Sequence, residues 1–210
     1  QRPKISRCVR PMPTPVDRLA RCDERASDTP IPPVEIRRWT AGDDMRALTQ
    51  LIHEAYAPLA ARGLRYWGRH QTAEDTAKRC ARGETWLALV GTDYVGTVTL
   101  SPPETPGGSP WLDRPDVAKF NQLCVHPTFQ GSGLGSGLLD LVERRAAELG
   151  AAHVACDTSE DAHALIQRYE RRGYVFVEHV DWRPRTNYRS VVLSLGLCSP
   201  TGTGRSESTG

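Results

Sequence analysis

The chain has 210 residues, of which 39% are hydrophobic and 25% are charged, and its formal net charge is +2. This balance is ordinary for a globular protein with a full core, and the net charge is too small to argue for nucleic acid or an acidic membrane as the main partner. No stretch approaches the roughly 20 apolar residues of a membrane-spanning helix. We therefore expect one soluble domain that binds neither nucleic acid nor membrane, with the cytoplasm as its location.

The cysteines occur singly, with no C-x-x-C pair and no histidine at zinc-finger spacing. A chain of this size with an adequate core does not need a disulfide framework. Cys124 and Cys156 fall within apolar runs, where a thiol is typical of a small buried hydrophobe. The sequence therefore predicts no metal site.

Both ends of the chain differ in composition from its middle. Residues 1–33 are basic and rich in proline, with little apolar periodicity and without the apolar segment of a secretory signal. Residues 199–210 are polar and of low complexity. We expect a disordered or loosely attached leader at 1–33, a folded domain at 34–198 and a tail at 199–210.

The first half of the domain contains alternating helix and strand patterns. We expect a strand at 34–39, a helix after Asp43 or Asp44, a second helix at 72–82, and strands at 85–90 and 94–100. The apolar residues of the first helix recur on one face: Met45, Leu48, Leu51, Ile52 and Ala55. The short connection between the two later strands predicts a hairpin.

The second half repeats the alternation around one strand–loop–helix unit. We expect strands at 117–125, 152–156, 174–180 and 189–195, and helices at 134–149 and 162–172. Gly150 and Gly173 stand where a helix commonly ends. Strand runs on both sides of the central unit predict a mixed α/β domain.

The most informative segment runs from Leu123 to Leu138, where a strand is followed by glycines at 131, 133, 135 and 137 and then directly by a helix. The first N–H groups of a helix have no internal partner and carry partial positive charge. Glycines allow the backbone to approach an anion closely. The segment therefore predicts a site for a pyrophosphate-sized ligand.

Two common nucleotide motifs do not fit this segment. The dinucleotide fingerprint G-x-G-x-x-G fails in both registers, because its last position falls on Ser136 or on Leu138. The mononucleotide P-loop requires a lysine before its final serine or threonine, and the turn has no lysine.

What does fit is V-x-P followed by Q-x-x-G-x-G over residues 125–135, together with Y-x-x-x-G-Y at 169–174. These motifs resemble those of the GNAT N-acetyltransferase superfamily, whose pyrophosphate loop has arginine or glutamine, two residues, glycine, one residue, then glycine or alanine. The order of strands and helices over roughly residues 34–197 is also similar to that family. A structural explanation, in which the glycines only permit tight strand–helix packing, remains the alternative.

The resemblance implies a mixed, mostly antiparallel central sheet with about four flanking helices, splayed at the fourth and fifth strands. It implies acetyl-CoA as cosubstrate, with Leu123 and Val125 offering backbone groups to the pantetheine arm. The implied cofactor-binding residues are Leu123, Cys124, Val125, Gln130, Gly131, Ser132, Gly133, Leu134, Gly135 and Ser136.

Tyr169 falls at the position of the family's tyrosine, which makes it the candidate general acid for the departing CoA thiolate. A phenol with a pKa near 10 can donate a proton to a thiolate whose parent thiol has a pKa near 8.5. Its helical spacing from Leu165 also allows a second interpretation, in which Tyr169 is only a core aromatic.

The general base is harder to find. Many family members carry a glutamate on the fourth strand, but residues 119–123 contain no carboxylate. Asp116, Glu160 and His163 are candidates, whereas His126 fits a surface or packing role better. The family's usual asparagine at the start of the last helix is replaced by Ala162.

The acceptor amine is expected to lie among the aromatics of variable segments, with Tyr66, Trp67 and Trp182 as candidates. Short loops and the lack of an acidic run favour a small-molecule amine. Two alternatives stay open: a non-catalytic acyl-CoA-binding sensor, and a protein or peptide N-acetyltransferase. The resemblance also allows a homodimer.

Overall fold

The computed structural model describes residues 33–197, so the predicted leader, except Pro33, and the predicted tail lie outside the described residues. The described part forms one seven-stranded sheet with the order β1-β2-β3-β4-β5-β7-β6. The strands are β1 Glu35–Arg38, β2 Glu84–Val90, β3 Asp93–Ser101, β4 Val117–Val125, β5 His153–Ser159, β6 Val175–Asp181 and β7 Arg189–Gly196. Every neighbouring pair is antiparallel except β4 and β5.

Four α-helices occur within the described residues: α2 Met45–Ala60, α3 Ala73–Cys80, α4 Leu134–Glu148 and α5 His163–Arg171. Two short 3-10 turns, η1 Trp67–Arg69 and η2 Pro127–Phe129, precede α3 and α4. Asp44 caps α2 by accepting hydrogen bonds from the amides of Arg46 and Ala47, and Thr72 begins α3 with a reciprocal capping box. The expected mixed sheet with about four helices is therefore confirmed.

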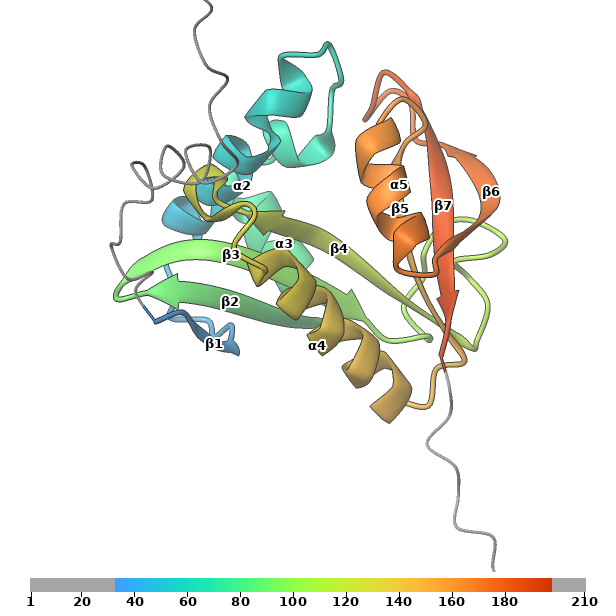
Figure 1. Ribbon diagram of the computed structural model, residues 1–210, viewed down its shortest axis with the longest axis horizontal. Coiled ribbons are helices and arrows are strands. Elements are labelled where there is room, and N and C mark those ends of the chain that lie inside the picture. The colour runs from blue at the N-terminus through green and yellow to red at the C-terminus, as the bar shows by residue number, and fades with distance from the viewer. Residues whose placement is uncertain (1–32, 198–210) are drawn as a thin grey trace, which may run out of the picture. The chain divides into compact units, whose positions relative to one another are not determined.

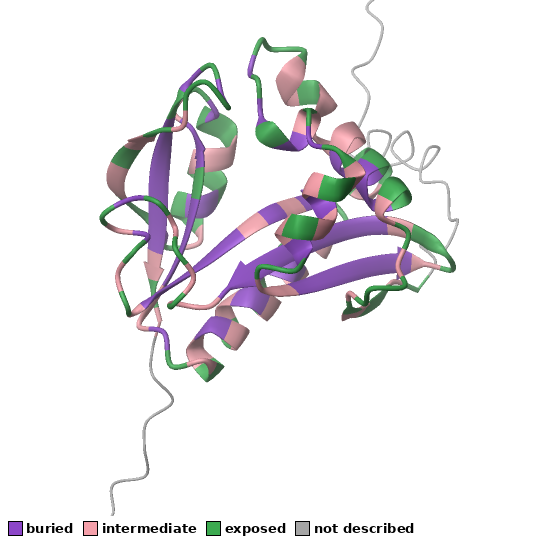
Figure 2. Ribbon diagram, turned by 180° about the vertical axis from the view of Figure 1, so that it is seen from behind, coloured by how far each residue is buried: buried purple, intermediate pink, exposed green. Residues whose placement is uncertain are grey.

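The helices cover the sheet from both faces (Figures 1 and 2). α4 and α5 pack on one face over a core that includes Val98, Phe120 and Val154. α2 and α3 pack on the opposite face against Leu87, Leu89 and Cys124. None of these four helices is both long and apolar enough to cross a bilayer.

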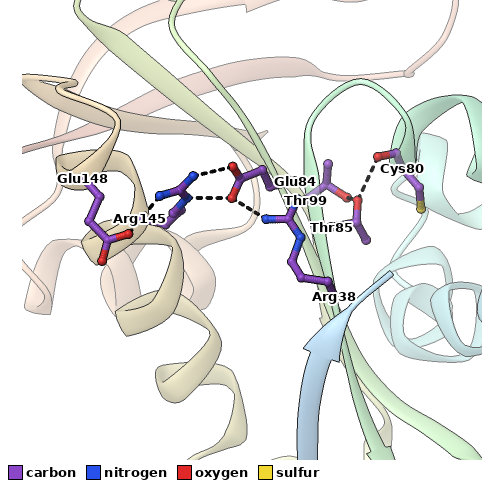
Figure 3. Close-up of polar contacts among 7 residues, drawn as sticks. All are labelled: Arg38, Cys80, Glu84, Thr85, Thr99, Arg145 and Glu148. Atoms are coloured by element: carbon purple, nitrogen blue, oxygen red, sulfur yellow. Dashed lines mark hydrogen bonds and ion pairs between the residues drawn. The ribbon is translucent and has the colours of Figure 1, made fainter. Parts of the chain in front are cut away.

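The beginning of β2 is connected to a helix on each face (Figure 3). The Arg145 guanidinium of α4 donates two hydrogen bonds of 2.8 Å to the Glu84 carboxylate, which also pairs with Arg38. The Thr85 hydroxyl donates to the Cys80 carbonyl of α3 over 3.1 Å. These contacts fix the position of α4, whose N-terminus follows the glycine-rich turn.

β4 and β5 pair over three residues only and then separate. Val117, Ala118 and Lys119 pair with His153, Val154 and Ala155, and the pairing ends there. Beyond that point β4 contains a bulge, marked by the register shift on β3 and by the positive φ of 54° at Gln122. The sheet is therefore splayed at β4 and β5, as the resemblance implied.

Most predicted elements match the observed ones within a few residues, and β5 differs most. The apolar run predicted a strand ending at Cys156, whereas β5 continues to Ser159. The additional residues are polar, so no apolar pattern marks them. They remain in the sheet because β7 pairs with them, for example Ser159 with Ser190.

Candidate active site

A cavity of about 830 Å³ lies where β4 and β5 separate. Its walls come from the β4 bulge, the end of β5, α2 and α3 on one face, and α4 and α5 on the other face. The connection between β6 and β7 contributes Trp182, Arg185 and Thr186. A volume near the upper end of the usual range for ligand sites, roughly 300–1,000 Å³, leaves room for more than one small group.

The backbone of β4 offers unpaired groups to this cavity. The amide of His126 donates to the Val95 carbonyl of the β3 side over 2.8 Å. Because N–H groups alternate in direction along an antiparallel strand, the amides of Leu123 and Val125 face away from β3. That edge has no strand partner, since the pairing with β5 ended at Lys119.

The glycine-rich turn adds further unpaired amides between the end of β4 and the start of α4. Gly131 and Gly133 have φ angles of 85° and 91°, in the left-handed region that glycine adopts without strain. The first intrahelical bond of α4 joins the Gly137 amide to the Gly133 carbonyl over 3.0 Å. Within the described chain, the amides of Gly131, Gly133, Gly135 and Ser136 have no protein acceptor. This arrangement suits a diphosphate.

The predicted cofactor-binding residues lie along one path. Leu123, Cys124, Val125, Gln130, Gly135 and Ser136 line the cavity, while Gly131, Ser132, Gly133 and Leu134 form the turn at its edge. The Gln130 side chain donates to the Val125 carbonyl over 3.3 Å, which joins the turn to the end of β4. The Cys124 side chain is buried, and burial raises the pKa of its thiol to about 12. Cys124 therefore serves as a packing residue, as expected.

Tyr169 lies on α5 and forms part of the cavity wall. Its ring packs against Tyr174 at 5.3 Å and Phe120 at 6.1 Å between centroids, and its hydroxyl lies beside the Cys156 thiol. Burial is the main reason that the pKa of Tyr169 lies well above its ordinary value. The hydroxyl thus keeps its proton at neutral pH, and the residue belongs both to the cavity wall and to the core under α4 and α5.

The three predicted acceptor residues also line the cavity. Tyr66 is buried, and its hydroxyl is 3.0 Å from the Thr158 hydroxyl. Trp67 is 38% exposed and lies at the rim in η1. The Trp182 indole N–H donates to Asp157 over 2.9 Å.

None of the general-base candidates from the sequence lies in the cavity wall. Asp116 pairs with Arg114, and Glu160 pairs with Arg189. His126 caps η2 and lies 3.2 Å from Glu54. His163 stands at the exposed start of α5, after Ala162, which gives that helix no side-chain cap. These four residues are therefore not placed for proton transfer to a group in the cavity.

The structure also brings charged residues to the cavity wall that the sequence did not reveal, among them Asp157 of β5 and Arg79 of α3. Asp157 belongs to the polar end of β5 that no apolar pattern marked. Arg79 lies beside Lys78 in the last turn of the short helix α3, and no sequence pattern distinguishes the two cations. The described chain contains no group of three or more His, Cys, Asp or Glu side chains suited to a metal ion.

Residues 45–174 match the model of the acetyltransferase (GNAT) family. This match spans more than half of the chain and includes the β4 bulge, the glycine-rich turn and Tyr169. The chain belongs to the GNAT acetyltransferase family.

Two curated relatives and one solved structure illustrate the similarity. The mycothiol acetyltransferase of Geodermatophilus obscurus is 30% identical over 156 residues, which are 71% of this chain and 47% of that protein. The S-(2-succino)cysteine N-acetyltransferase of Bacillus subtilis is 26% identical, over 63% of this chain and 79% of that protein. A GNAT family acetyltransferase from Elizabethkingia anophelis, solved with acetyl-CoA bound, is 16% identical with a TM-score of 0.55, over 78% of this chain and 98% of that one. The chain thus spans about half the length of the mycothiol acetyltransferase that it matches, and the solved structure supports the fold alone.

Proposed function

We propose that this protein transfers an acetyl group from acetyl-CoA to an amine of a small molecule. The observation that carries the proposal is the row of unpaired main-chain amides from Leu123 and Val125 through Gly131 and Gly133 to the N-terminus of α4. Such a row matches a ligand with an extended polar arm and a diphosphate. A GNAT relative of the same fold has acetyl-CoA bound.

The charges around the cavity also support a ligand of this kind. Seven arginine or lysine side chains line it, against two aspartates. Arg168 and Arg171 of α5 lie on the same face as α4, where phosphate groups would gather. An excess of positive charge in a concave site attracts anions.

The enclosed acceptor side supports a small molecule over a protein chain. The Asn187 side chain bridges the connection after α2, accepting from the Arg65 amide and donating to the Gly63 carbonyl, both over 2.8 Å. Leu64, Tyr66 and Tyr188 pack beneath this bridge. These hydrogen bonds join the connection after α2 to the connection between β6 and β7 on the acceptor side of the cavity.

In this proposal the Val125 amide donates a hydrogen bond to the thioester oxygen, where negative charge develops during the reaction. Tyr169 donates its proton to the departing sulfur. Burial raises the pKa of Tyr169 and makes the phenol a weaker acid, but it also disfavours a free thiolate in the cavity, so the charge that develops on sulfur is what drives the proton transfer.

The test is release of free thiol from acetyl-CoA in the presence of a panel of amines. Tyr169→Phe should lower kcat by about 100-fold, the lower end of the usual effect of a general acid, with little change in acetyl-CoA affinity. Tyr94→Phe is the control, because the Tyr94 hydroxyl bonds to Asp43 outside the cavity. Unchanged turnover in Tyr169→Phe would remove the acid role. Binding of acetyl-CoA without transfer to any amine would favour a sensor instead.

A further inference from the structure

Asp157 presents a carboxylate to the acceptor side of the cavity. One carboxylate oxygen accepts a hydrogen bond of 2.9 Å from the Trp182 indole. No lysine or arginine within residues 33–197 forms an ion pair with it. The side chain is accessible from inside the cavity although protein atoms surround it. The Asp157 carboxylate therefore has no ion-pair partner within the described residues to balance its negative charge.

Aromatic rings form a fixed wall beside this carboxylate. The ring centroids of Tyr66 and Tyr188 are 4.9 Å apart, and those of Tyr66 and Tyr56 are 5.4 Å apart. The Tyr66 hydroxyl contacts the Thr158 hydroxyl and accepts from the Ser159 amide over 3.3 Å, on the residues next to Asp157. Tyrosine rings favour a nearby cation, so the wall and the carboxylate suit the same ligand group, an ammonium ion.

Arg79 supplies the opposite charge in the same cavity. Its guanidinium donates to two neutral amide oxygens, to Gln71 over 2.7 Å and to Asn121 over 3.2 Å. Within the described chain it forms no ion pair with a carboxylate. A partly buried guanidinium held by neutral groups is ready to bind an anion, and its planar donors match a carboxylate.

We propose that the acceptor is an amino acid or a close analogue, whose ammonium group binds Asp157 and whose carboxylate binds Arg79. This inference rests on the proposed acetyl transfer and names its substrate class and its proton acceptor. Asp157 is then the general base that the sequence did not reveal.

The step balances as follows. Asp157 takes one proton from the acceptor's ammonium group, which frees the nitrogen lone pair. That lone pair forms the C–N bond to the acetyl carbon, and the C–S bond breaks with its electron pair on sulfur. Tyr169 gives its proton to sulfur and regains one from the new amide nitrogen. The proton on Asp157 leaves to solvent, so one proton is released for each acetyl group transferred.

The environment of Asp157 suits a proton acceptor. Burial raises the pKa of its carboxyl group, while the Trp182 hydrogen bond and the Arg79 charge lower it. The other titratable groups that interact with Asp157 are Tyr56 of α2, Tyr66, Tyr188 and the neighbouring Cys156 thiol. Burial raises the pKa values of all four, so they stay neutral and Asp157 is the group that changes charge.

The first experiment compares Asp157→Asn with the wild-type protein. Asparagine keeps an oxygen for the Trp182 indole and removes the proton acceptor. We expect kcat/KM for the amine to fall by about 100-fold or more and the acidic limb of its pH profile to disappear. The melting temperature should stay equal or rise at neutral pH, because a carboxyl group with a raised pKa destabilises the folded state when it is charged. Asp93→Asn, at the exposed first residue of β3, is the matched control.

The second experiment pairs each amino acid with the amine left after decarboxylation. Arg79→Gln should lower kcat/KM at least 10-fold for amino acids and leave the decarboxylated amines nearly unchanged, whereas Asp157→Asn should impair both. Amino acids alone, without acetyl-CoA, should raise the melting temperature of the wild type and not of either variant. A wild type that prefers the decarboxylated amines, or an Asp157→Asn variant with an intact pH profile, would overturn the inference. Failure of acetyl-CoA to bind at all would instead overturn the proposed function.

Discussion

At the scale of single residues, the glycines of the turn after β4 have different roles. Gly133 has a φ of 91° and precedes α4, whereas Gly137 lies inside α4 with ordinary backbone angles. A Cβ at either position would meet no protein atom within 4 Å. Backbone conformation and the ligand, and not protein packing, therefore decide what each glycine tolerates.

We predict that Gly133→Ala lowers the free energy of unfolding by about 1 kcal/mol, because an alanine resists the left-handed conformation. It should also raise the Kd for acetyl-CoA, since the amide of residue 133 must keep its direction. Gly137→Ala should instead raise stability by up to about 1 kcal/mol through helix propensity. Urea unfolding and acetyl-CoA titration measure both effects. Equal acetyl-CoA affinity in Gly133→Ala and the wild type would contradict the role of the turn.

At the scale of elements, the ion pairs of Glu84 hold α4 against the sheet. The Glu84 side chain is 19% exposed, and its pKa lies below its ordinary value mainly because Arg145 donates to it. A carboxylate with a lowered pKa stabilises the fold above the pKa of the unfolded state, and this contribution is lost as pH falls through the folded pKa.

We predict that Glu84→Gln lowers the free energy of unfolding by about 1–2 kcal/mol at pH 7, a typical effect for partly exposed charged hydrogen bonds. The difference from the wild type should shrink as pH falls from the ordinary glutamate value of about 4.3 through the lower pKa of the folded state. Glu74→Gln, whose pair with Lys78 is largely exposed, should have almost no effect. Chemical unfolding at several pH values provides the measurement. A difference that is constant with pH would rule out this electrostatic explanation.

At the scale of the whole domain, the sheet has two parts, strands β1 to β4 and strands β5 to β7. These two parts share more of the hydrophobic core on one face of the sheet than on the other. The core under α4 and α5 includes residues from both parts, such as Val98 and Val191. On the opposite face, the cluster around Leu48 is separate from the cluster around Val192, which reaches β4 only at its first residue, Val117. The cavity with Asp157 and Arg79 opens on the side where the core is divided.

We predict that acetyl-CoA joins the two parts and raises the melting temperature by roughly 5–10 °C at 100 times its Kd, whereas NAD and ATP do not. Hydrogen exchange should slow at the amides of Leu123 and Val125. The Cys124 amide is the internal control, because it already faces β3 and should change less. Equal protection of all three amides would indicate general tightening without the proposed strand-like contact.

Local features of the fold were predictable because they depend on neighbours in sequence. Asp44 and Thr72 cap their helices through backbone groups two or three residues away. The glycine-rich turn is equally local, since glycine spacing and the following helix set its geometry. The polar end of β5 was missed because its place in the sheet comes from pairing with β7, some 30 residues later.

The sequence by itself thus determined the order of elements, the glycine-rich turn and the position of Tyr169, because each depends on spacing along one segment. Only the tertiary structure decided how far β4 and β5 stay paired, and therefore where the cavity opens. It also decided that Asp157 and Arg79, which lie 78 positions apart in the chain, face the same space. Long-range strand pairing and helix packing set those positions, and no local pattern of residues encodes them.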